Sequence, residues 1–161
     1  MHQFDRDIAL QKQDPTRFRG EVSNNWSINN IPNGGYLMAI LAKAMSRCSD
    51  KQATPVLTVN YLARCAADEV QLSVEQLSKS KQFNRLQVRL IQEGREKARA
   101  FGTFAGETDA CMIDRIETSP PAVAAPEACI AFPTMPTYTL FDQLDVRLDP
   151  SYAGWMQGQL V

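Results

Sequence analysis

The fold is decided by Asn33-Gly34-Gly35-Tyr36 and the run that follows it, Leu37-Met38-Ala39-Ile40-Leu41-Ala42-Lys43-Ala44-Met45. The two glycines open a helix that we predict from about Gly34 to Cys48, with apolar side chains almost all the way round. Such a helix is expected to be wrapped by other elements rather than laid on a surface. Its first backbone N–H groups lack intrahelical acceptors and stand at the positive end of the helix dipole. This N-terminus is therefore a candidate site for a carbonyl oxygen or an anion.

Four extended segments follow the helix, and apolar residues alternate with polar ones along them. Val70, Leu72 and Val74 show this alternation, which is typical of strands with one buried face in an antiparallel sheet. The segments are Val56 to Ala63, Glu69 to Ser78, Gln82 to Gln92 and Lys97 to Gly106, with Glu93-Gly94-Arg95 as a hairpin loop and two shorter strands earlier, at 4–10 and 17–23. The sequence predicts an α+β fold, a helix followed by a meander, in which the helix covers one face of the sheet.

Composition changes after this region. Five of the nine prolines lie between Thr118 and Pro136, which is typical of an extended linker. Alternation returns at Leu144, Val146 and Leu148, and Trp155 follows this segment much as Trp26 follows Val22. We predict a first domain over 1–110, a Pro/Ala-rich linker over 111–137, and the opening strand region of an incomplete second domain over 138–161.

Charge and composition exclude several classes of protein. The chain has 161 residues and a formal net charge of -1, which gives no general attraction to nucleic acid. Its longest apolar run is far shorter than the roughly 20 residues of a membrane span. The four cysteines, Cys48, Cys65, Cys111 and Cys129, lack the paired spacing of metal sites, and no secretory signal precedes them. We expect a cytoplasmic protein with reduced thiols, no metal and no cofactor.

With these motifs in this order, the chain resembles a hotdog domain, in which a curved antiparallel sheet wraps one long central helix. It is most similar to the acyl-CoA thioesterase II-like branch, whose members carry two fused hotdog domains. The resemblance covers roughly residues 15–106, with the start of a second domain from about 138. It rests on Phe18-Arg19-Gly20, Trp26, Pro32-Asn33-Gly34-Gly35-Tyr36, Leu57-Thr58-Val59-Asn60-Tyr61-Leu62 and Arg89-Leu90-Ile91-Gln92-Glu93-Gly94-Arg95.

The resemblance also shows two departures. In the family, the Asp, Thr and Gln that position the attacking water are carried mainly by the second domain, and this chain stops before the positions where they would lie. The loop ahead of the third strand usually holds a basic-glycine pair, but here it reads Ser78-Lys79-Ser80-Lys81-Gln82. His2 is the sole histidine, which excludes a histidine-based dyad from this chain alone and disfavours hotdog dehydratases and hydratases.

The glycine turn offers two interpretations. The amides of Gly34 and Gly35 can hold a thioester carbonyl oxygen, or the glycines let helix and sheet approach closely. Asn33 caps the helix, the commoner role of Asn at that place, or faces the substrate. Tyr36 is a packing residue with a satisfied hydroxyl or a residue that binds substrate.

Four further residues are candidates with less local support. Thr58 and Asn60 lie two apart on a strand, so both project to one face, where they orient a water or are simply solvated. In the resembling family this strand flanks the catalytic cleft. Lys81 and Arg85 add positive charge that can meet the phosphates of coenzyme A or belong to a solvated strand face.

Together these features predict an acyl-CoA thioesterase in which water attacks the thioester and the acyl chain lies along the apolar helix. The alternative is a non-catalytic acyl-CoA-binding or scaffold half that completes a partner's site. Because an antiparallel sheet leaves an edge strand to be paired or covered, we expect a homo-oligomer built by hotdog–hotdog pairing.

Overall fold

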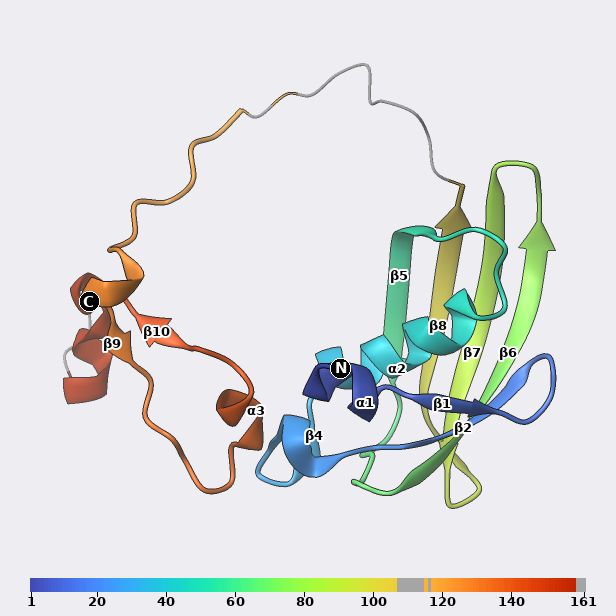
Figure 1. Ribbon diagram of the computed structural model, residues 1–161, viewed down its shortest axis with the longest axis horizontal. Helices are drawn as coiled ribbons and strands as arrows, with labels where there is room; N and C mark the ends of the chain where they lie inside the picture. The colour runs from blue at the N-terminus through green and yellow to red at the C-terminus, as the bar shows by residue number, and fades with distance from the viewer. Residues whose placement is uncertain (107–114, 116, 159–161) are drawn as a thin grey trace.

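A six-stranded antiparallel sheet curves around one long helix, α2 (Gly34–Ser46), as Figure 1 shows. The computed structural model describes residues 1–106, 115 and 117–158. In spatial order the strands are β1 (Leu10–Lys12), β2 (Arg17–Glu21), β6 (Glu69–Lys79), β7 (Phe83–Gln92), β8 (Arg95–Ala105) and β5 (Ala53–Tyr61). The predicted helix-and-meander arrangement is confirmed, with boundaries within three residues for the helix and the four long strands.

The core lies between α2 and the concave face of the sheet. Alternate residues of β6, β7 and β8 are buried there, and from α2 the buried side chains are Tyr36, Leu37, Ile40, Leu41, Ala44 and Met45. The sheet encloses one side of the helix only. On the other side Gly35 and Met38 are exposed and Ala39 and Ala42 are half-buried. The expectation of a helix wrapped all round is therefore wrong for this side, because the curved sheet of one chain does not reach it.

The β7–β8 connection is a two-residue turn. Glu93 and Gly94 both have positive φ angles, +52° and +71°, and Gln92 pairs with Arg95. Two such residues give the twist that suits a tight hairpin. The predicted hairpin is confirmed.

The strand predicted at 4–10 is wrong over most of its length. Residues Gln3–Asp7 form a short helix, α1, and only Leu10 of the predicted span lies in a strand. His2 caps α1 by accepting a hydrogen bond from the Phe4 amide. Phe4 and Ile8, one helical turn apart, pack against the core, with the Phe4 ring edge-on to Trp26 at 5.0 Å. In a helical turn this spacing brings both side chains to one face.

Between β2 and α2 lie three short elements. They are the 3₁₀ helix η1 (Asn24–Trp26) and the strands β3 (Ser27–Ile28) and β4 (Ile31–Pro32), which pair with each other. Asn29 and Asn30 form the turn between them, with φ angles of +51° and +59°. Asparagine tolerates this left-handed conformation better than most residues. The hairpin leads directly into Asn33 and the start of α2.

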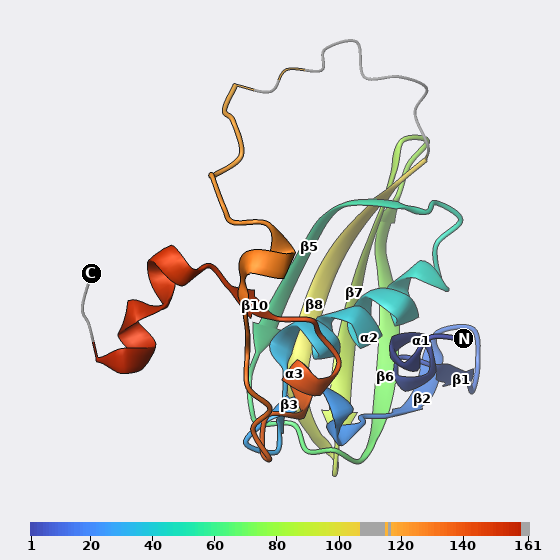
Figure 2. The ribbon, with the colours of Figure 1, turned by 60° about the vertical axis from the view of Figure 1, so that its left-hand side comes forward.

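The C-terminal part forms short elements: η2 (Pro126–Ala128), β9 (Ile130–Ala131), α3 (Thr139–Asp142), β10 (Arg147–Leu148) and η3 (Pro150–Gln157). The strand expected around 144–148 is only two residues long and pairs with β9. Most of this part lies apart from the sheet, but α3 lies beside β3 and β4 (Figures 1 and 2). The division into domain, linker and second domain stays a prediction, and its boundary at 110–111, with Cys111, lies outside the described residues.

Candidate active site at the N-terminus of the central helix

Asn33 holds the first turn of α2. Its side-chain Oδ1 accepts a hydrogen bond from the Gly35 amide at 2.8 Å, and its carbonyl accepts one from the Leu37 amide at 3.1 Å. Its own amide donates to the Trp26 carbonyl at 2.8 Å. The predicted capping role is present. Of the two glycine amides proposed to hold an oxygen, that of Gly35 is bonded to Asn33, whereas within the described residues that of Gly34 has no acceptor.

The two glycines differ in what surrounds them. A Cβ on Gly34 would lie 3.0 Å from the hydroxyl oxygen of Tyr61 and 3.1 Å from its ring. A Cβ on Gly35 would meet only the side-chain oxygen of Asn33, at 3.1 Å, and otherwise open space. Close packing thus explains Gly34, whereas the backbone at Gly35 is open to a ligand.

Tyr61, at the end of β5, reaches the same point, although it is not among the candidate site residues predicted from the sequence. Its hydroxyl donates to the Gly34 carbonyl, and the residue is 51% exposed. Burial of the rest of the side chain raises the pKa of Tyr61. Sequence alone does not link Tyr61 to Gly34, because the link depends on knowing that the end of β5 meets the start of α2.

Gly34→Ala tests this contact. We expect the substitution to lower the free energy of unfolding by about 1 kcal/mol, because the added methyl displaces the Tyr61 ring. In a Tyr61→Ala background the same change is expected to be neutral or stabilising, because alanine is the better helix former by roughly 1 kcal/mol. Urea titrations of the four proteins of this double-mutant cycle measure the coupling. Equal effects in both backgrounds would contradict the contact.

Tyr36 points into the protein. It is 3% exposed, and its hydroxyl donates to the Asp7 carbonyl at 2.8 Å and accepts from the Ser23 amide at 2.9 Å. Burial raises the pKa of Tyr36 to about 12. These contacts favour the packing interpretation, in which Tyr36 ties α1 to α2, and contact with substrate stays a prediction.

The raised pKa gives a pH dependence. The ordinary pKa of tyrosine is 10.0, and in the folded protein the pKa of Tyr36 is about 12. Between these two pH values the unfolded chain has lost the hydroxyl proton that the folded chain still holds. The contribution of Tyr36 to stability is therefore complete below pH 10.0 and is lost as the pH rises towards 12. Between these two pH values we expect the contribution of Tyr36 to the free energy of unfolding to fall by about 1.4 kcal/mol per pH unit. Urea titrations at several pH values should show that the free energy of unfolding falls less steeply with pH in Tyr36→Phe than in the wild type. Equal slopes for the two proteins would contradict a raised pKa of Tyr36.

Thr58 and Asn60 project to one face of β5, as their spacing predicts. That face is the convex one: their cross-strand neighbours are Phe101 and Arg99, whereas Leu57 on the other face packs against the core. Within this chain the structure does not bring them to the N-terminus of α2. A role in orienting water stays a prediction.

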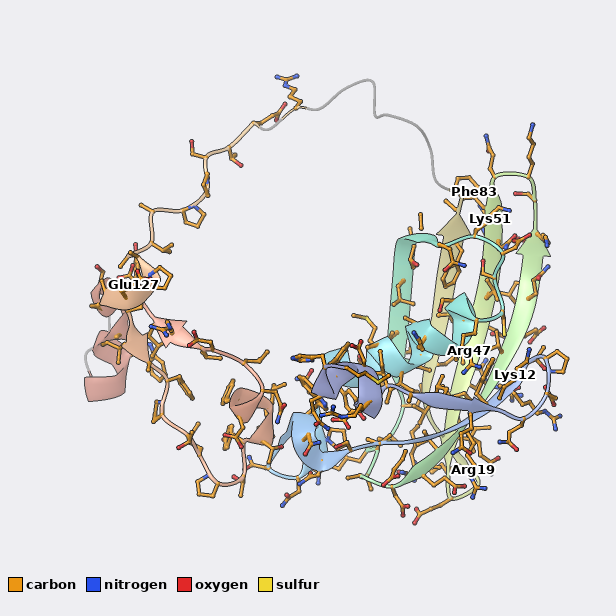
Figure 3. All side chains as sticks on the ribbon, viewed as in Figure 1. Lys12, Arg19, Arg47, Lys51, Phe83 and Glu127 are labelled. Carbon is orange, nitrogen blue, oxygen red and sulfur yellow. The ribbon has the colours of Figure 1, made fainter. Side chains whose placement is uncertain are left out.

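Lys81 and Arg85 lie at the opposite end of α2 from the glycines. The β6–β7 hairpin that carries them contacts the segment just after α2, where Asn84 donates to Asp50 and Lys79 pairs with Asp50 at 2.8 Å. Figure 3 shows Phe83 and Lys51 together at this end. Because a 13-residue helix is roughly 20 Å long, a ligand at Gly34 must be extended to contact either residue.

Residues 22–105 match a sequence model described as the acyl-CoA thioesterase N-terminal domain. The chain belongs to this family. The matched residues include α2 and the four long strands, and therefore the whole glycine turn of this thioesterase-family chain. Among curated protein sequences, no significant match is found.

Solved structures show the same fold. A protein provisionally named thioesterase II from Thermobifida fusca YX has 22% identity over 100% of this chain and a TM-score of 0.87. A hot dog fold protein from Alicyclobacillus acidocaldarius has 20% identity over 88% and a TM-score of 0.76. An acyl-CoA thioesterase II, TesB2, from Mycobacterium marinum has 16% identity over 80% and a TM-score of 0.65. The predicted hotdog fold is confirmed.

This thioesterase-family chain is shorter than these three proteins. It spans 60%, 53% and 47% of the lengths of those three chains. Within its described residues, no group of three or more His, Cys, Asp or Glu side chains is placed to hold a metal ion. The described helices include none long and apolar enough to cross a membrane.

Proposed function

We propose that this chain binds an acyl-CoA thioester at the N-terminus of α2 and takes part in its hydrolysis to a free acid and coenzyme A. The observation that carries the proposal is the first turn of the helix. There the Gly34 amide lacks a protein acceptor among the described residues, and the Gly35 backbone is open on one side. The family to which residues 22–105 belong supports the substrate class.

In this proposal the amide of Gly34 polarises the thioester carbonyl. A water oxygen attacks the carbonyl carbon, and the electron pair moves to the carbonyl oxygen, which accepts the Gly34 N–H. The carbon–sulfur bond then breaks, and a proton released by the water passes to the departing sulfur. A fixed amide at the positive end of a helix stabilises the developing charge without reorganising.

The exposed side of α2 supplies a place for the acyl chain. Gly35, Met38, Ala39 and Ala42 recur at the spacing of one helix face, and none of them is charged. Met38, which is 37% exposed, gives this face a flexible apolar side chain that can adapt to different ligands. An acyl chain that starts at Gly34 would run along these residues.

A non-catalytic scaffold half is the second candidate. It is favoured by the lack of an evident base beside the glycine turn in the part of the chain that the structure describes, because the sole histidine, His2, caps α1 and the Asn33 side chain is bonded to Gly35. The resemblance to double hotdog thioesterases assigns the water-positioning groups to a second domain. In that case this chain would bind acyl-CoA and a partner would complete the reaction.

One experiment separates the two candidates. The purified chain is incubated with acyl-CoA esters of increasing length, free thiol is measured over time, and binding is measured by calorimetry. Turnover supports the thioesterase, and binding without turnover supports the scaffold. If the chain shows no binding and no turnover, both candidates are contradicted.

The partner proposed here is a second hotdog domain on β5. Among the described residues this nine-residue strand pairs with β8 alone and forms one edge of the sheet, and Val56 on it and Leu62 just after it are both 55% exposed. An edge strand presents unpaired backbone N–H and C=O groups that another chain can pair with, so a long one with exposed apolar residues is normally paired or covered. Pairing between two copies would cover it, and a cytoplasmic location stays a prediction.

Val56→Lys tests this edge. We expect light scattering to give the mass of two chains for the wild type and of one chain for the variant, because the added charge opposes edge pairing. Leu77→Lys is the control, since Leu77 is 48% exposed on β6, away from the edge. A single-chain mass for the wild type, or equal masses for both variants, would refute pairing at β5.

A further inference from the structure

Residues 137–141, called the strap below, cross back from the C-terminal part of the chain onto the loop before α2. Thr139 makes the central contact: its hydroxyl donates to the Asn24 carbonyl and accepts from the Ser27 amide at 3.1 Å. Leu140, next in the strap, packs against the core. Figures 1 and 2 both show α3, which includes Thr139, beside the β3–β4 hairpin.

A second pair of contacts fixes the turn of that hairpin. The Asn29 amide donates to the Thr137 carbonyl at 2.7 Å, and the Thr137 hydroxyl donates to the Asn29 side-chain oxygen at 2.9 Å. Asn29 has a positive φ angle of +51°, which is uncommon for residues other than glycine although asparagine tolerates it better than most. The strap therefore binds both the base and the turn of the hairpin.

The hairpin in turn holds the cap of α2. Ser27, which is fully buried, pairs with Pro32, and the next residue, Asn33, donates its amide to the Trp26 carbonyl. Thr139 thus contacts Ser27 and Asn24, the two residues that flank Asn25 and Trp26 in the chain. A continuous set of hydrogen bonds leads from Thr139 through the Trp26–Ser27 peptide group to Asn33, and from the Asn33 side chain to the Gly35 amide, next in the chain to Gly34.

We propose that the strap is a positioning segment of the α2 site, and that the Thr139 hydroxyl couples the C-terminal part of the chain to the Asn33 cap. Its effect on acyl-CoA rests on the function proposed above, but its effect on the cap does not. The site is then complete only when residues beyond the linker are docked. The strap acts through Asn33 and does not itself contact the thioester.

Hydrogen exchange on the full chain tests the coupling. In Thr139→Val we expect the amides of Ser27 and Asn33 to exchange about tenfold faster, while the amide of Val88 in the sheet keeps its rate, because the opening is local. Thr139→Ser retains the hydroxyl and should restore the wild-type rates. Thr134→Val is the control, since Thr134 is exposed and lies outside the strap.

Two results decide the outcome. Faster exchange at Ser27 with an unchanged rate at Asn33 would overturn the proposal, because the strap would then stabilise the hairpin without affecting the Asn33 cap. If Thr139→Val unfolds the whole chain, Thr137→Val decides instead. That variant removes only the side-chain bond to Asn29, and an unchanged Asn33 rate in it would overturn the proposal equally.

An activity readout follows the exchange data. We expect kcat/KM with acyl-CoA to fall about tenfold in Thr139→Val and to recover in Thr139→Ser, since the cap positions the Gly34 amide. If the wild-type chain shows neither turnover nor binding, the proposed function is contradicted. The exchange experiment would still test whether the strap is coupled to the Asn33 cap. Turnover that is equal in wild type and Thr139→Val, with exchange at Asn33 altered, would show that the cap does not serve the site.

Discussion

Gly35→Val is expected to weaken acyl-CoA binding strongly and leave the fold in place. The valine side chain would occupy the open space beside the Gly34 amide, where a Cβ meets only the side-chain oxygen of Asn33. Because no core side chain lies nearby and valine is no worse than glycine in a helix, we expect little change in stability. We expect the affinity for acyl-CoA to fall about a hundredfold, which corresponds to a loss of about 2.7 kcal/mol of binding free energy.

Calorimetric titration with acyl-CoA and a thermal melt measure the two effects. Lys43→Val is the matched control, because Lys43 is exposed on the same helix, about two turns beyond Gly35. Gly35→Ala should give an intermediate loss, since its single methyl displaces only the Asn33 side chain. Wild-type affinity in Gly35→Val would remove the glycine turn from the binding site.

Leu41→Ala is expected to produce the largest loss of stability. Leu41 is 0% exposed and lies at the centre of the α2 face that packs on the sheet. Truncating a leucine in such a position removes transfer free energy and leaves a cavity, with losses of about 2–5 kcal/mol. The expected effect tests whether α2 is buried by the sheet or only lies beside it.

Urea denaturation measures this loss as a shift of the midpoint at constant m value. Leu77→Ala, at a half-exposed position on β6, is the matched control and is expected to change stability by less than about 0.5 kcal/mol. Similar losses in the two variants would mean that the helix is not enclosed.

The parts of the fold that were predictable depend on local pattern. The glycine pair with its apolar run gives α2, and the alternation at Val70 and Leu86 gives strands whose inner residues are buried. α1 was not predictable as a helix, because its five residues are stabilised by packing of Phe4 against Trp26, which lies 22 positions further along the chain. Short elements are generally fixed by such tertiary contacts rather than by propensity.

The candidate site divides in the same way. Capping by Asn33 follows from its place before the helix, whereas Tyr61 reaches Gly34, and the strap reaches the loop before the helix, from distant parts of the sequence. The spacing of Thr58 and Asn60 predicts that they share a face but not which face, because that choice depends on which side chains of β5 meet the helix. Charge alone associates Lys81 and Arg85 with the site, and charge does not show where in the fold a residue lies.

The most direct test of the account is whether a thioester carbonyl reaches the Gly34 amide. A ketone analogue of acyl-CoA, in which a methylene replaces the thioester sulfur, retains the carbonyl and resists hydrolysis. Titrated into isotope-labelled protein, it should move the Gly34 amide proton downfield and slow its exchange, with accompanying shifts at the Met38 methyl group. Binding that leaves Gly34 unchanged and produces its largest shifts elsewhere would contradict the proposed site.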